Sequence, residues 1–449
     1  MDTPIKDFVE KYAQSKTVRL HMPGHKGARD SFYRFDITEI EGADVLYNSQ
    51  GIIRKSEENA SLLFGSARTV YSAEGSSLCI RAMLMLAVIK ACSDGRKPTV
   101  LVGRNAHRTF LSAAILLGIK PVWLYGSDYS DIMSCRISAR DCERAIEECK
   151  EPPCAVYITS PDYLGNMSDI AGIAEVCRRH GILFLVDNAH GAYLHFTESP
   201  AHPLDLGADI CCDSAHKTLP VLTGGAYLHL SRNVPEWLIA RAEDAMAFFA
   251  STSPSYLILS SLDSANAYIA HRYRERLAEC IHMVKRLGEE LFERGYTLVG
   301  DEGLKITLRT KKFGYRGYEI ADILRSDGIE CEYSDPDYTV MMFTPENTRS
   351  DFKRVSCTLN GINRREEIFE EPPRLDRAPV YVTDARSALM SGSTVIDTEK
   401  ACGRVLASLT AGCPPAVPPA VCGELLTERT VEIYKYYGIK KCFVTSDFS

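Results

Sequence analysis

Short apolar runs alternate with amphipathic segments between about residues 70 and 230. This alternation is typical of strand–helix units around a largely parallel sheet, so we expect an α/β fold. Helices are predicted to begin near Ser77, His107, Ser138 and Asp169. The predicted strands are Thr99–Val102, Pro121–Tyr125, Cys154–Thr159, Ile182–Asp187, Asp209–Ser214 and Gly225–Leu230. In such sheets ligands bind at the carboxyl ends of the strands.

Three regions differ in their patterning. Residues 1–48 hold the Gly- and Pro-interrupted loop HMPGHKG and read as an arm rather than a domain. Helical periodicity dominates from about Ser260 to Arg294, and shorter mixed elements follow. We therefore expect an arm over 1–48, a large domain over 49–295 and a smaller C-terminal domain over 296–449. In the last region the proline-rich segment Cys413–Val421 is predicted to be a rigid surface turn.

Composition narrows the class of protein. The chain has 449 residues, 45% hydrophobic and 25% charged, which suits two globular domains. Lys and Arg number 52 against 59 Asp and Glu, and no basic block occurs, so nucleic acid is not an expected partner. The N-terminus lacks the apolar core of a signal peptide, and no run approaches the ~20 apolar residues of a membrane span; a cytoplasmic protein is expected. The 16 cysteines form no CxxC pair, which favours buried thiols over metal ligands or disulfides.

Polar residues that could take part in catalysis follow two of the predicted strands. Lys217 lies in DSAHKTL directly after an apolar run, and Asp187 ends the run ILFLVD. A lysine alone at such a place is usually a surface residue. A buried carboxylate, however, is costly unless a cation or donors meet it, and either a structural ion pair or the ring nitrogen of a bound pyridinium would do so.

Two helix starts add to this set. Gly75, Ser76 and Ser77 precede an apolar helix, where free N–H groups and hydroxyls favour an anion, although a plain N-cap has the same residues. His107 begins another helix and could face the same crevice. Together these groups fit pyridoxal 5'-phosphate (PLP): the amine condenses with the aldehyde as a Schiff base, and the carboxylate keeps the pyridine nitrogen protonated. Once it has condensed with the aldehyde, the lysine is an imine and does not have to be buried as a charged ammonium.

Several motifs, in order along most of the chain, carry a resemblance to a known family. They are HMPGHKG (residues 21–27), ITEIEGADVL with GIIRKSEENASLLFGS, SPDYLGN (160–166), VDNAHGA, SAHKTL and STSPSYLILSSLD (251–263). The sequence resembles the Orn/Lys/Arg decarboxylases among the fold-type-I PLP enzymes, in their short form without an N-terminal receiver-like domain. The resemblance implies an aspartate-aminotransferase-like large domain with a mainly parallel sheet and a smaller C-terminal α+β domain.

The resemblance also implies roles for single residues. Lys217 would bind the cofactor aldehyde, Asp187 would pair with the pyridine nitrogen, His107 would stack on the ring, and His190 would lie near the Asp187 side. The cofactor phosphate would be held by Gly75, Ser76, Ser77, Ser214 and His216. SPDYLGN would line the crevice near the ring hydroxyl. STSPSY would lie at a subunit interface and reach the partner's site, which implies a homodimer. No metal is implied.

The chain departs from the family pattern at three places. Ala73-Glu74-Gly75-Ser76 stands where the family often has Asn-Gly-Ser/Thr, but the glycine and the hydroxyl are kept. Gly224 replaces a common glutamine, and CPPAVP replaces a more usual YPPGIP. The last two changes leave the cofactor residues intact and concern the identity of the substrate.

The reaction implied is α-decarboxylation of arginine, lysine or ornithine to carbon dioxide and a polyamine-type amine, with arginine or lysine ranked ahead of ornithine. Either Lys217 or His216 would protonate the α-carbon. A distal ammonium or guanidinium needs carboxylates. The candidates are Asp44, Glu332, Asp335 and Asp337.

Other functions remain open at this stage. An aminotransferase or an aldolase-type lyase would use Lys217 and Asp187 equally well, and Arg309 or Arg316 would then have to bind the substrate carboxylate. A catalytically silent PLP-binding regulator is the alternative from another class. It would not need the lysine, the aspartate and both histidines together.

Overall fold

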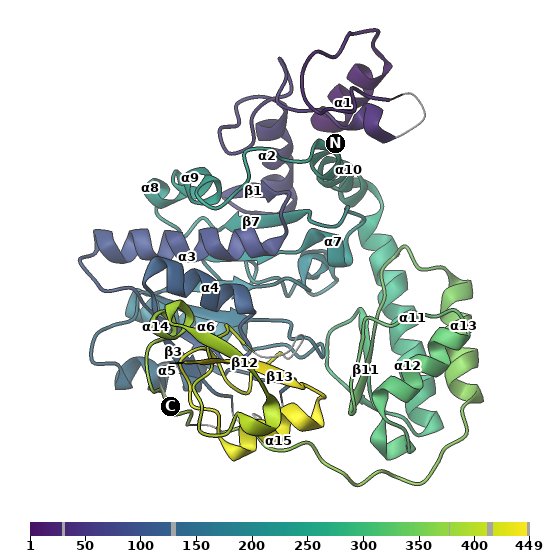
Figure 1. The fold of residues 1–449 in the computed structure, drawn as a ribbon. Helices are drawn as coiled ribbons and strands as arrows, with labels where there is room; N and C mark the ends of the chain where they lie inside the picture. Colours follow the sequence, from purple (N-terminus) through teal and green to yellow (C-terminus); the bar gives the residue numbers. More distant parts are fainter. Residues whose placement is uncertain (29–31, 127–131, 377, 411–415, 447–449) are drawn as a thin grey trace.

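The computed structural model describes residues 1–28, 32–126, 132–376, 378–410 and 416–446. A seven-stranded sheet lies at its centre, in the order β1-β7-β6-β5-β4-β2-β3 (Figure 1). Its strands are β1 (Arg68–Ser72), β2 (Thr99–Gly103), β3 (Lys120–Leu124), β4 (Ala155–Thr159), β5 (Leu183–Asp187), β6 (Ile210–Asp213) and β7 (Ala226–Leu230). Each of the six predicted strands is present. β1 was missed.

The sheet is parallel from β3 to β6, and β7 runs antiparallel to both of its neighbours. The prediction of a largely parallel sheet is therefore confirmed. Each parallel strand is followed by a loop at the same edge, so that Thr159, Asp187 and Asp213 end neighbouring strands side by side. This edge collects the polar residues that were predicted to carry the chemistry.

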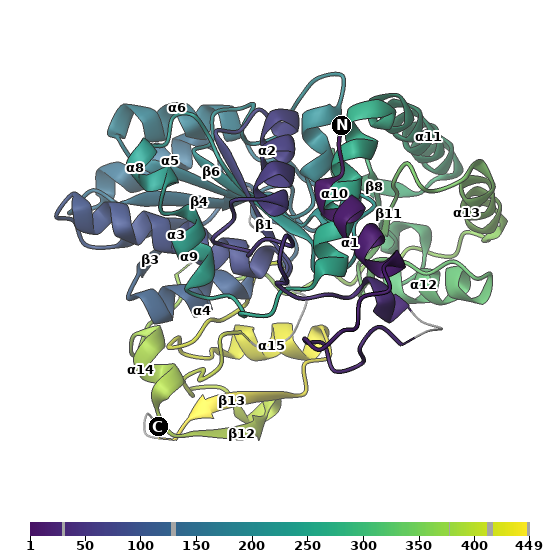
Figure 2. The ribbon, with the colours of Figure 1, turned by 90° about the horizontal axis from the view of Figure 1, so that it is seen from above.

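Helices cover both faces of the sheet (Figures 1 and 2). On one face α3 and α4 pack on residues such as Val102 and Leu185, and on the other α5 and α6 pack on Val156 and Val186. Alternate residues of each strand serve opposite faces, as a buried sheet requires. The helices of this part are α2 (Ile52–Phe64), α3 (Ser76–Ser93), α4 (Arg108–Leu117), α5 (Ala139–Glu148), α6 (Ile170–His180), α7 (Ala215–Thr218), α8 (Glu236–Ile239) and α9 (Ala242–Ala247).

Helix α3 is mostly apolar, with Arg81 and Lys90 as its charged residues. Within the described residues it is the one helix long and apolar enough to cross a membrane by length and composition alone, and half of it is buried. Leu78, Met83 and Leu86 are among the buried side chains that it packs into the cluster against the sheet. Its apolar character is explained by this packing.

The arm contains α1 (Pro4–Gln14), which packs on α2 and on α10 (Tyr256–His271). Oδ2 of Asp263 in α10 accepts hydrogen bonds from the backbone N–H groups of Ile5 and Lys6, at 2.9 and 3.0 Å. The helical periodicity predicted one helical region from about Ser260 to Arg294. The structure has two helices there, because α10 ends at His271 and α11 (Tyr273–Arg294) begins after Arg272. Figure 2 shows the arm and α10 side by side.

The C-terminal part holds two further sheets. The first, in the order β10-β11-β9-β8, is antiparallel; its strands are β8 (Thr297–Val299), β9 (Lys305–Arg309), β10 (Tyr333–Ser334) and β11 (Tyr338–Met342), with α12 (Gly317–Ser326) and α13 (Arg349–Gly361). The second pairs β12 (Ser393–Asp397) with β13 (Lys441–Thr445), beside α14 (Ala385–Met390) and α15 (Glu428–Tyr436). Short 3-10 helices are Phe32–Phe35, Ala192–Phe196, Lys311–Phe313 and Thr398–Lys400. The division at residues 48 and 295 stays a prediction.

The last part of the chain returns to the large sheet. Glu424 forms a bidentate ion pair with Arg104, which follows β2, at 2.8 and 2.7 Å, and both side chains are 1% exposed. Val421 and Cys422 pack on Leu111 and Ile115 of α4. The rigid surface turn predicted for Cys413–Val421 is wrong where that segment is described, because Val417 is fully buried; residues 413–415 lie outside the described residues. The prediction failed because the proline-rich composition was taken as a sign of an exposed turn.

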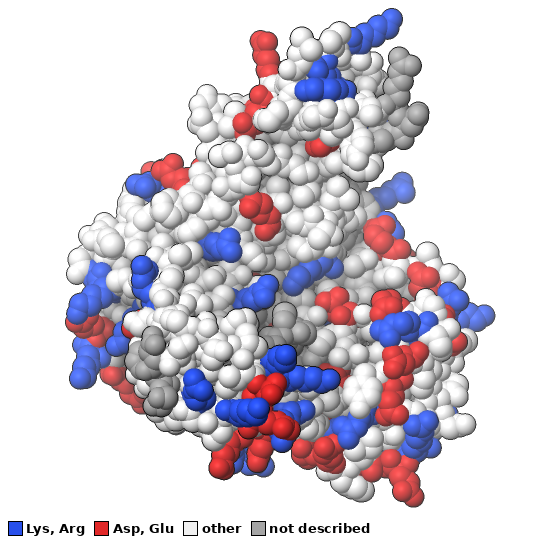
Figure 3. Space-filling model, viewed as in Figure 1, with Lys and Arg blue, Asp and Glu red and all other residues white. Residues whose placement is uncertain are grey.

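Charged side chains are mixed over the face shown in Figure 3. Neither blue nor red residues form a continuous field there, in keeping with the formal net charge of -7 spread over 449 residues.

Candidate active site

A pocket of about 430 Å³ lies at the carboxyl ends of the parallel strands. Every residue that the sequence assigned to the cofactor lines it: Gly75, Ser76, Ser77, His107, Asp187, His190, Ser214, His216 and Lys217. These residues come from four segments around one sheet edge, which follow β1, β2, β5 and β6. The structure thus brings together groups that are up to 142 positions apart, Gly75 and Lys217 being the extremes.

Asp187 ends β5 and is buried, with 2% of its surface exposed. The hydroxyl of Tyr157 on the neighbouring strand β4 donates to Oδ2 at 3.2 Å, and the Ala189 N–H donates to Oδ1 at 3.2 Å. The carboxylate therefore has donors but no lysine or arginine as an ion-pair partner within 4.0 Å among the described residues. It remains available to a cation inside the pocket.

Lys217 lies in the short helix α7 after β6 and points its amine at a histidine. Its Nζ is 3.0 Å from Nε2 of His190. Burial lowers the pKa of Lys217, and the charge of Asp187 offsets this only in part. Burial, together with the charges of Lys305 and Lys217, lowers the pKa of His190 well below its usual value. The result is a neutral imidazole that can accept a hydrogen bond from an amine whose lowered pKa favours loss of its proton.

His107 caps the N-terminus of α4 and lines the same pocket. Its Nδ1 accepts from the Thr109 N–H at 3.3 Å and lies 2.8 Å from the Thr109 hydroxyl, so the ring is held in place. Burial lowers the pKa of His107, which favours the neutral ring that would stack on an aromatic ligand.

One end of the pocket is built for an anion. It is the N-terminus of α3, an 18-residue helix whose first N–H groups have no partner within the helix. Gly75 precedes it at φ +74°, a conformation that glycine adopts readily, and the hydroxyl of Ser214 donates to Oγ of Ser76 at 2.7 Å. Nδ1–H of His216 donates to the carbonyl of Gly225 at 2.9 Å, which fixes that ring beside the same end.

A buried, hydrogen-bonded cluster around Asp213 lies next to this end of the pocket. Asp213, directly before Ser214, accepts from Nδ2 of Asn188 at 2.6 Å and from Nε2 of His202 at 3.0 Å, and Nε2 of His229 lies 3.3 Å away. Although burial opposes it, the imidazoles hold the pKa of Asp213 well below its usual range. His202, Cys211 and Asp213 are close enough to hold a metal, but Nδ1 of His202 accepts the Leu204 N–H, so Nε2 is the protonated nitrogen and donates to Asp213. These contacts fix the strand ends that carry Asp187 and Ser214.

The SPDYLGN loop forms another wall. Tyr163 packs edge-on against His190, with ring centroids 5.5 Å apart, and its hydroxyl donates to Oε1 of Glu332 at 2.8 Å. The other three carboxylates considered for the distal cation are committed elsewhere. Asp44 accepts from the backbone at the start of α2, Asp335 accepts from the Asp337 and Tyr338 N–H groups, and Asp337 pairs with Lys311.

Comparisons with known proteins agree with this geometry. Residues 3–299 match the family model described as the Orn/Lys/Arg decarboxylase major domain. The chain belongs to the Orn/Lys/Arg decarboxylase family. The arginine decarboxylase of Bacillus subtilis is 28% identical over 463 residues, covering 96% of this chain and 92% of that protein. The prediction of this family, and with it of an amino-acid decarboxylase, is confirmed.

Solved structures confirm the fold class. The lysine decarboxylase LdcF of Francisella novicida superposes with a TM-score of 0.79 at 16% identity, over 98% of this chain and 79% of that one. A ureidoglycine–glyoxylate aminotransferase of Bacillus subtilis gives a TM-score of 0.55 at 17% identity, over 69% and 83% of the two chains. At these identities the likeness shows the fold and not the reaction.

The decarboxylase family motifs did not reveal every residue at the site. Tyr157 was read only as part of an apolar strand, and Asn105, Thr159 and Lys305 were not singled out. Oδ1 of Asn105, Oγ1 of Thr159 and Nδ1 of His190 are buried and have no hydrogen-bond partner among the described residues, and all three residues line the pocket. A polar ligand would satisfy such atoms. Polar residues at strand ends were the signal that could have found Asn105 and Thr159.

Proposed function

We propose that the protein is a PLP-dependent decarboxylase of a basic amino acid, with arginine as the first substrate to test. The observation that carries this proposal is the pocket in which Lys217, Asp187 and the α3 N-terminus face one another. When bound, PLP supplies an aldehyde that captures the substrate amine and a protonated ring that accepts the electrons of the broken C–CO₂ bond.

The pocket fits this cofactor. It offers an anion site at one end, a carboxylate without an ion-pair partner among the described residues at the strand end of β5, and buried polar atoms that lack partners. Its volume of about 430 Å³ suits a small cofactor together with an amino acid. Ser76, Ser77, Ser214 and His216 would hold the phosphate, and Gly75 allows the backbone to come close to it.

Each catalytic residue contributes a separate task. Asp187 would hold a proton on the ring nitrogen of the cofactor, because its buried carboxylate has no lysine or arginine as an ion-pair partner among the described residues. His107 would cover one face of the ring and keep water from it. Lys217 acts as a neutral amine, which its lowered pKa favours, and His190 accepts its N–H. Lys217 or His216 returns the proton to the α-carbon after carbon dioxide leaves.

Glu332 is our candidate for binding the distal guanidinium or ammonium of the substrate. Its Oε1 accepts from Tyr163, which lines the pocket, and its charge raises the pKa of Lys217, so it is close enough to act on the site. The match to arginine decarboxylase over 96% of the chain favours arginine. An arginine side chain would find in Glu332 the planar carboxylate that its guanidinium prefers.

The aminotransferase alternative lacks its arginine. Arg309 pairs with Glu371 at 2.8 Å and Arg316 with Glu370 at 2.5 Å, and neither arginine lines the pocket. A failed decarboxylation assay would nevertheless point to transamination, an aldolase-type reaction or a silent regulator.

We also propose a homodimer in the cytoplasm that serves polyamine synthesis. The arm presents Val18, Leu20 and Met22 with 77%, 90% and 63% of their surface exposed, and Phe248 beside STSPSY is 68% exposed. A second copy of the chain would cover such side chains. Glu74, at the pocket edge, accepts the Ser251 N–H at 2.7 Å, so STSPSY begins next to the site of its own chain; its reach into the site of a partner stays a prediction. Sedimentation at several concentrations tests the assembly.

The test of the proposed function is carbon dioxide release from purified, PLP-loaded protein offered arginine, lysine and ornithine separately. Lys217→Ala is the matched control. Release from one substrate that the control abolishes supports the proposal and names the substrate. No release from any of the three, with a visible cofactor band that Lys217→Ala removes, overturns it.

A further inference from the structure

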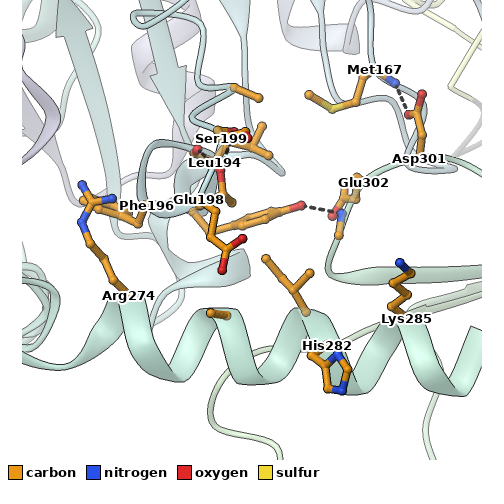
Figure 4. A pocket seen from close by; sticks show the side chains of 16 residues that line it. Met167, Leu194, Phe196, Glu198, Ser199, Arg274, His282, Lys285, Asp301 and Glu302 are labelled. Carbon is orange, nitrogen blue, oxygen red and sulfur yellow. Dashed lines mark hydrogen bonds between the residues drawn. The ribbon is translucent and has the colours of Figure 1, made fainter.

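A second pocket, of about 600 Å³, lies between α11 and the Asp301–Gly303 turn (Figure 4). Met167 and Glu302 both line it, and Figure 4 shows Asp301 bonded to Met167 next to Glu302. Glu302 pairs with Lys305 at the start of β9, with Nζ and Oε2 3.0 Å apart. Nζ of Lys305 also donates to the carbonyl of Asp162 at 3.2 Å, and Asp162 lines the active-site pocket. The Glu302–Lys305 pair therefore lies between the two pockets.

This pair is part of a dense set of bonds to the SPDYLGN loop. The carbonyl of Gly165 accepts from the Asp301 and Glu302 N–H groups, both at 2.9 Å, and the Thr307 hydroxyl donates to the carbonyl of Leu164 at 2.9 Å. The side chains of Lys305 and Glu302 are 2% and 0% exposed. Burying an ion pair costs desolvation energy, which the hydrogen bonds from Lys305 to Glu302 and to the Asp162 carbonyl offset.

The loop in turn sets the surroundings of His190. Tyr163 contacts the His190 ring, and Nε2 of His190 contacts Lys217. The charged and titratable groups that act on His190 come from three elements besides its own: Lys305 in β9, Lys217 and His216 in α7, and His107 at the start of α4. Lys305 makes the largest contribution among them to the lowered pKa of His190, after burial itself, and it acts in the same direction on Lys217.

We propose that Lys305 is a positioning residue, which holds the SPDYLGN loop against the cofactor pocket and so fixes the buried surroundings of the His190–Lys217 contact. The proposal deepens the proposed function and rests on it for its catalytic meaning. A neutral Lys217 is the nucleophilic form of the amine, and the His190 ring can accept a hydrogen bond from it, so a buried cation outside the pocket acts on both groups without touching the substrate.

The experiment compares Lys305→Met, which removes the charge, with Lys305→Arg, which keeps it. The ring signals of His190 in cofactor-free protein with labelled histidine, assigned by His190→Gln, are followed by NMR as a function of pH. The visible absorbance of the PLP-loaded protein is titrated in parallel. Lys305→Met is expected to move both midpoints upward by roughly one pH unit, and Lys305→Arg to restore them.

Two further variants complete the test. Lys311→Met removes another buried lysine, which pairs with Asp337 and is not among the main charges that act on His190 or Lys217, and is expected to leave both midpoints unchanged. Glu302→Gln leaves the Lys305 charge uncompensated and is expected to lower the midpoints, which keeps a readout if Lys305→Met does not fold. Unchanged His190 midpoints in folded Lys305→Met or Glu302→Gln protein overturn the proposal. Absence of carbon dioxide release from the wild type overturns only the proposed function, because the NMR titration needs neither cofactor nor turnover.

Discussion

The hydroxyl of Tyr157 on β4 donates a hydrogen bond to Oδ2 of Asp187 on β5, with 3.2 Å between the oxygens, and both side chains are buried. A hydrogen bond to a charged group contributes roughly 1.5–3 kcal/mol. Tyr157→Phe is therefore expected to lower the free energy of unfolding of the cofactor-free protein by about that amount. The protonated ring nitrogen of bound PLP would donate a hydrogen bond to the same carboxylate, so the loss should be smaller in the loaded protein.

Urea unfolding with and without PLP measures both values. The matched control is Tyr227→Phe, because the Tyr227 hydroxyl is buried without a hydrogen-bond partner among the described residues. An equal loss for the two variants, or no difference between loaded and cofactor-free protein, would contradict the role given to Tyr157.

The Ser76–Ser214 contact predicts a loss of cofactor affinity. Ser214→Ala removes a hydroxyl that donates to Ser76 beside the α3 N-terminus, and the phosphate loses a donor in turn. We expect the dissociation constant of PLP to rise about 10-fold. Absorbance titration with PLP gives the constant. Ser326→Ala, which removes an exposed hydroxyl in α12, is the control and should leave the constant unchanged.

Glu332→Gln is expected to separate substrate binding from the chemistry. The variant removes the charge that we assign to the distal guanidinium, so KM for arginine should rise roughly 10-fold or more while PLP affinity stays the same. Glu330→Gln, two positions earlier and paired with exposed Arg325, serves as the control. Steady-state carbon dioxide release gives both parameters. A fall in kcat alone, with KM unchanged, would count against this assignment.

Local sequence signals were enough for most of the large sheet. Runs such as Leu183–Val186 are continuous and apolar because the strand is buried on both faces, and the polar residues after them mark the ligand edge. β1 escaped notice because Arg68, Thr69 and Ser72 break the apolar pattern. Arg68 is buried only because Glu57, 11 positions earlier, and Glu243, 175 positions later, pair with it.

The sequence alone could not predict contacts between segments that are far apart along the chain. Lys305 follows an ordinary glycine turn, and nothing nearby signals that its amine reaches Asp162, 143 positions earlier. The break at Arg272 was hidden because apolar residues keep a helical spacing on both sides of it. Motif resemblance pointed to residues that line one pocket, but the residues that orient them, such as Tyr157 and Asp213, were not assigned a role from the sequence.

The Arg104–Glu424 pair makes a prediction about stability. Glu424→Gln removes the carboxylate that pairs with a guanidinium only 1% exposed, and breaking a buried pair in this way costs about 3–5 kcal/mol. The double variant Arg104→Met with Glu424→Gln removes both charges and should recover part of the loss. Chemical unfolding of the three proteins measures the coupling. Asp397→Asn, which breaks the exposed pair with Lys400, should cost less than about 1 kcal/mol.

The attachment of the arm should depend on pH through Asp263. Burial raises the pKa of this carboxyl from 3.8 to about 6, although the Ser56 hydroxyl and two backbone N–H groups of α1 donate to it. The folded chain thus holds the proton more tightly than the unfolded chain does. The resulting stabilisation is complete below about pH 4 and is lost as pH rises through about 6, a change of roughly 3 kcal/mol.

Asp263→Asn cannot ionise and keeps the shape of the side chain, so its free energy of unfolding should lack this fall. Urea unfolding between about pH 4.5 and 7.5 measures the difference between wild type and variant, which should shift in favour of the variant as pH rises. Asp327→Asn, at an exposed helix end, provides the control for the loss of an exposed carboxylate. Parallel pH curves for wild type and Asp263→Asn would show that the carboxyl is already ionised at ordinary acidity in the folded chain, and that α1 is held by a charged acceptor.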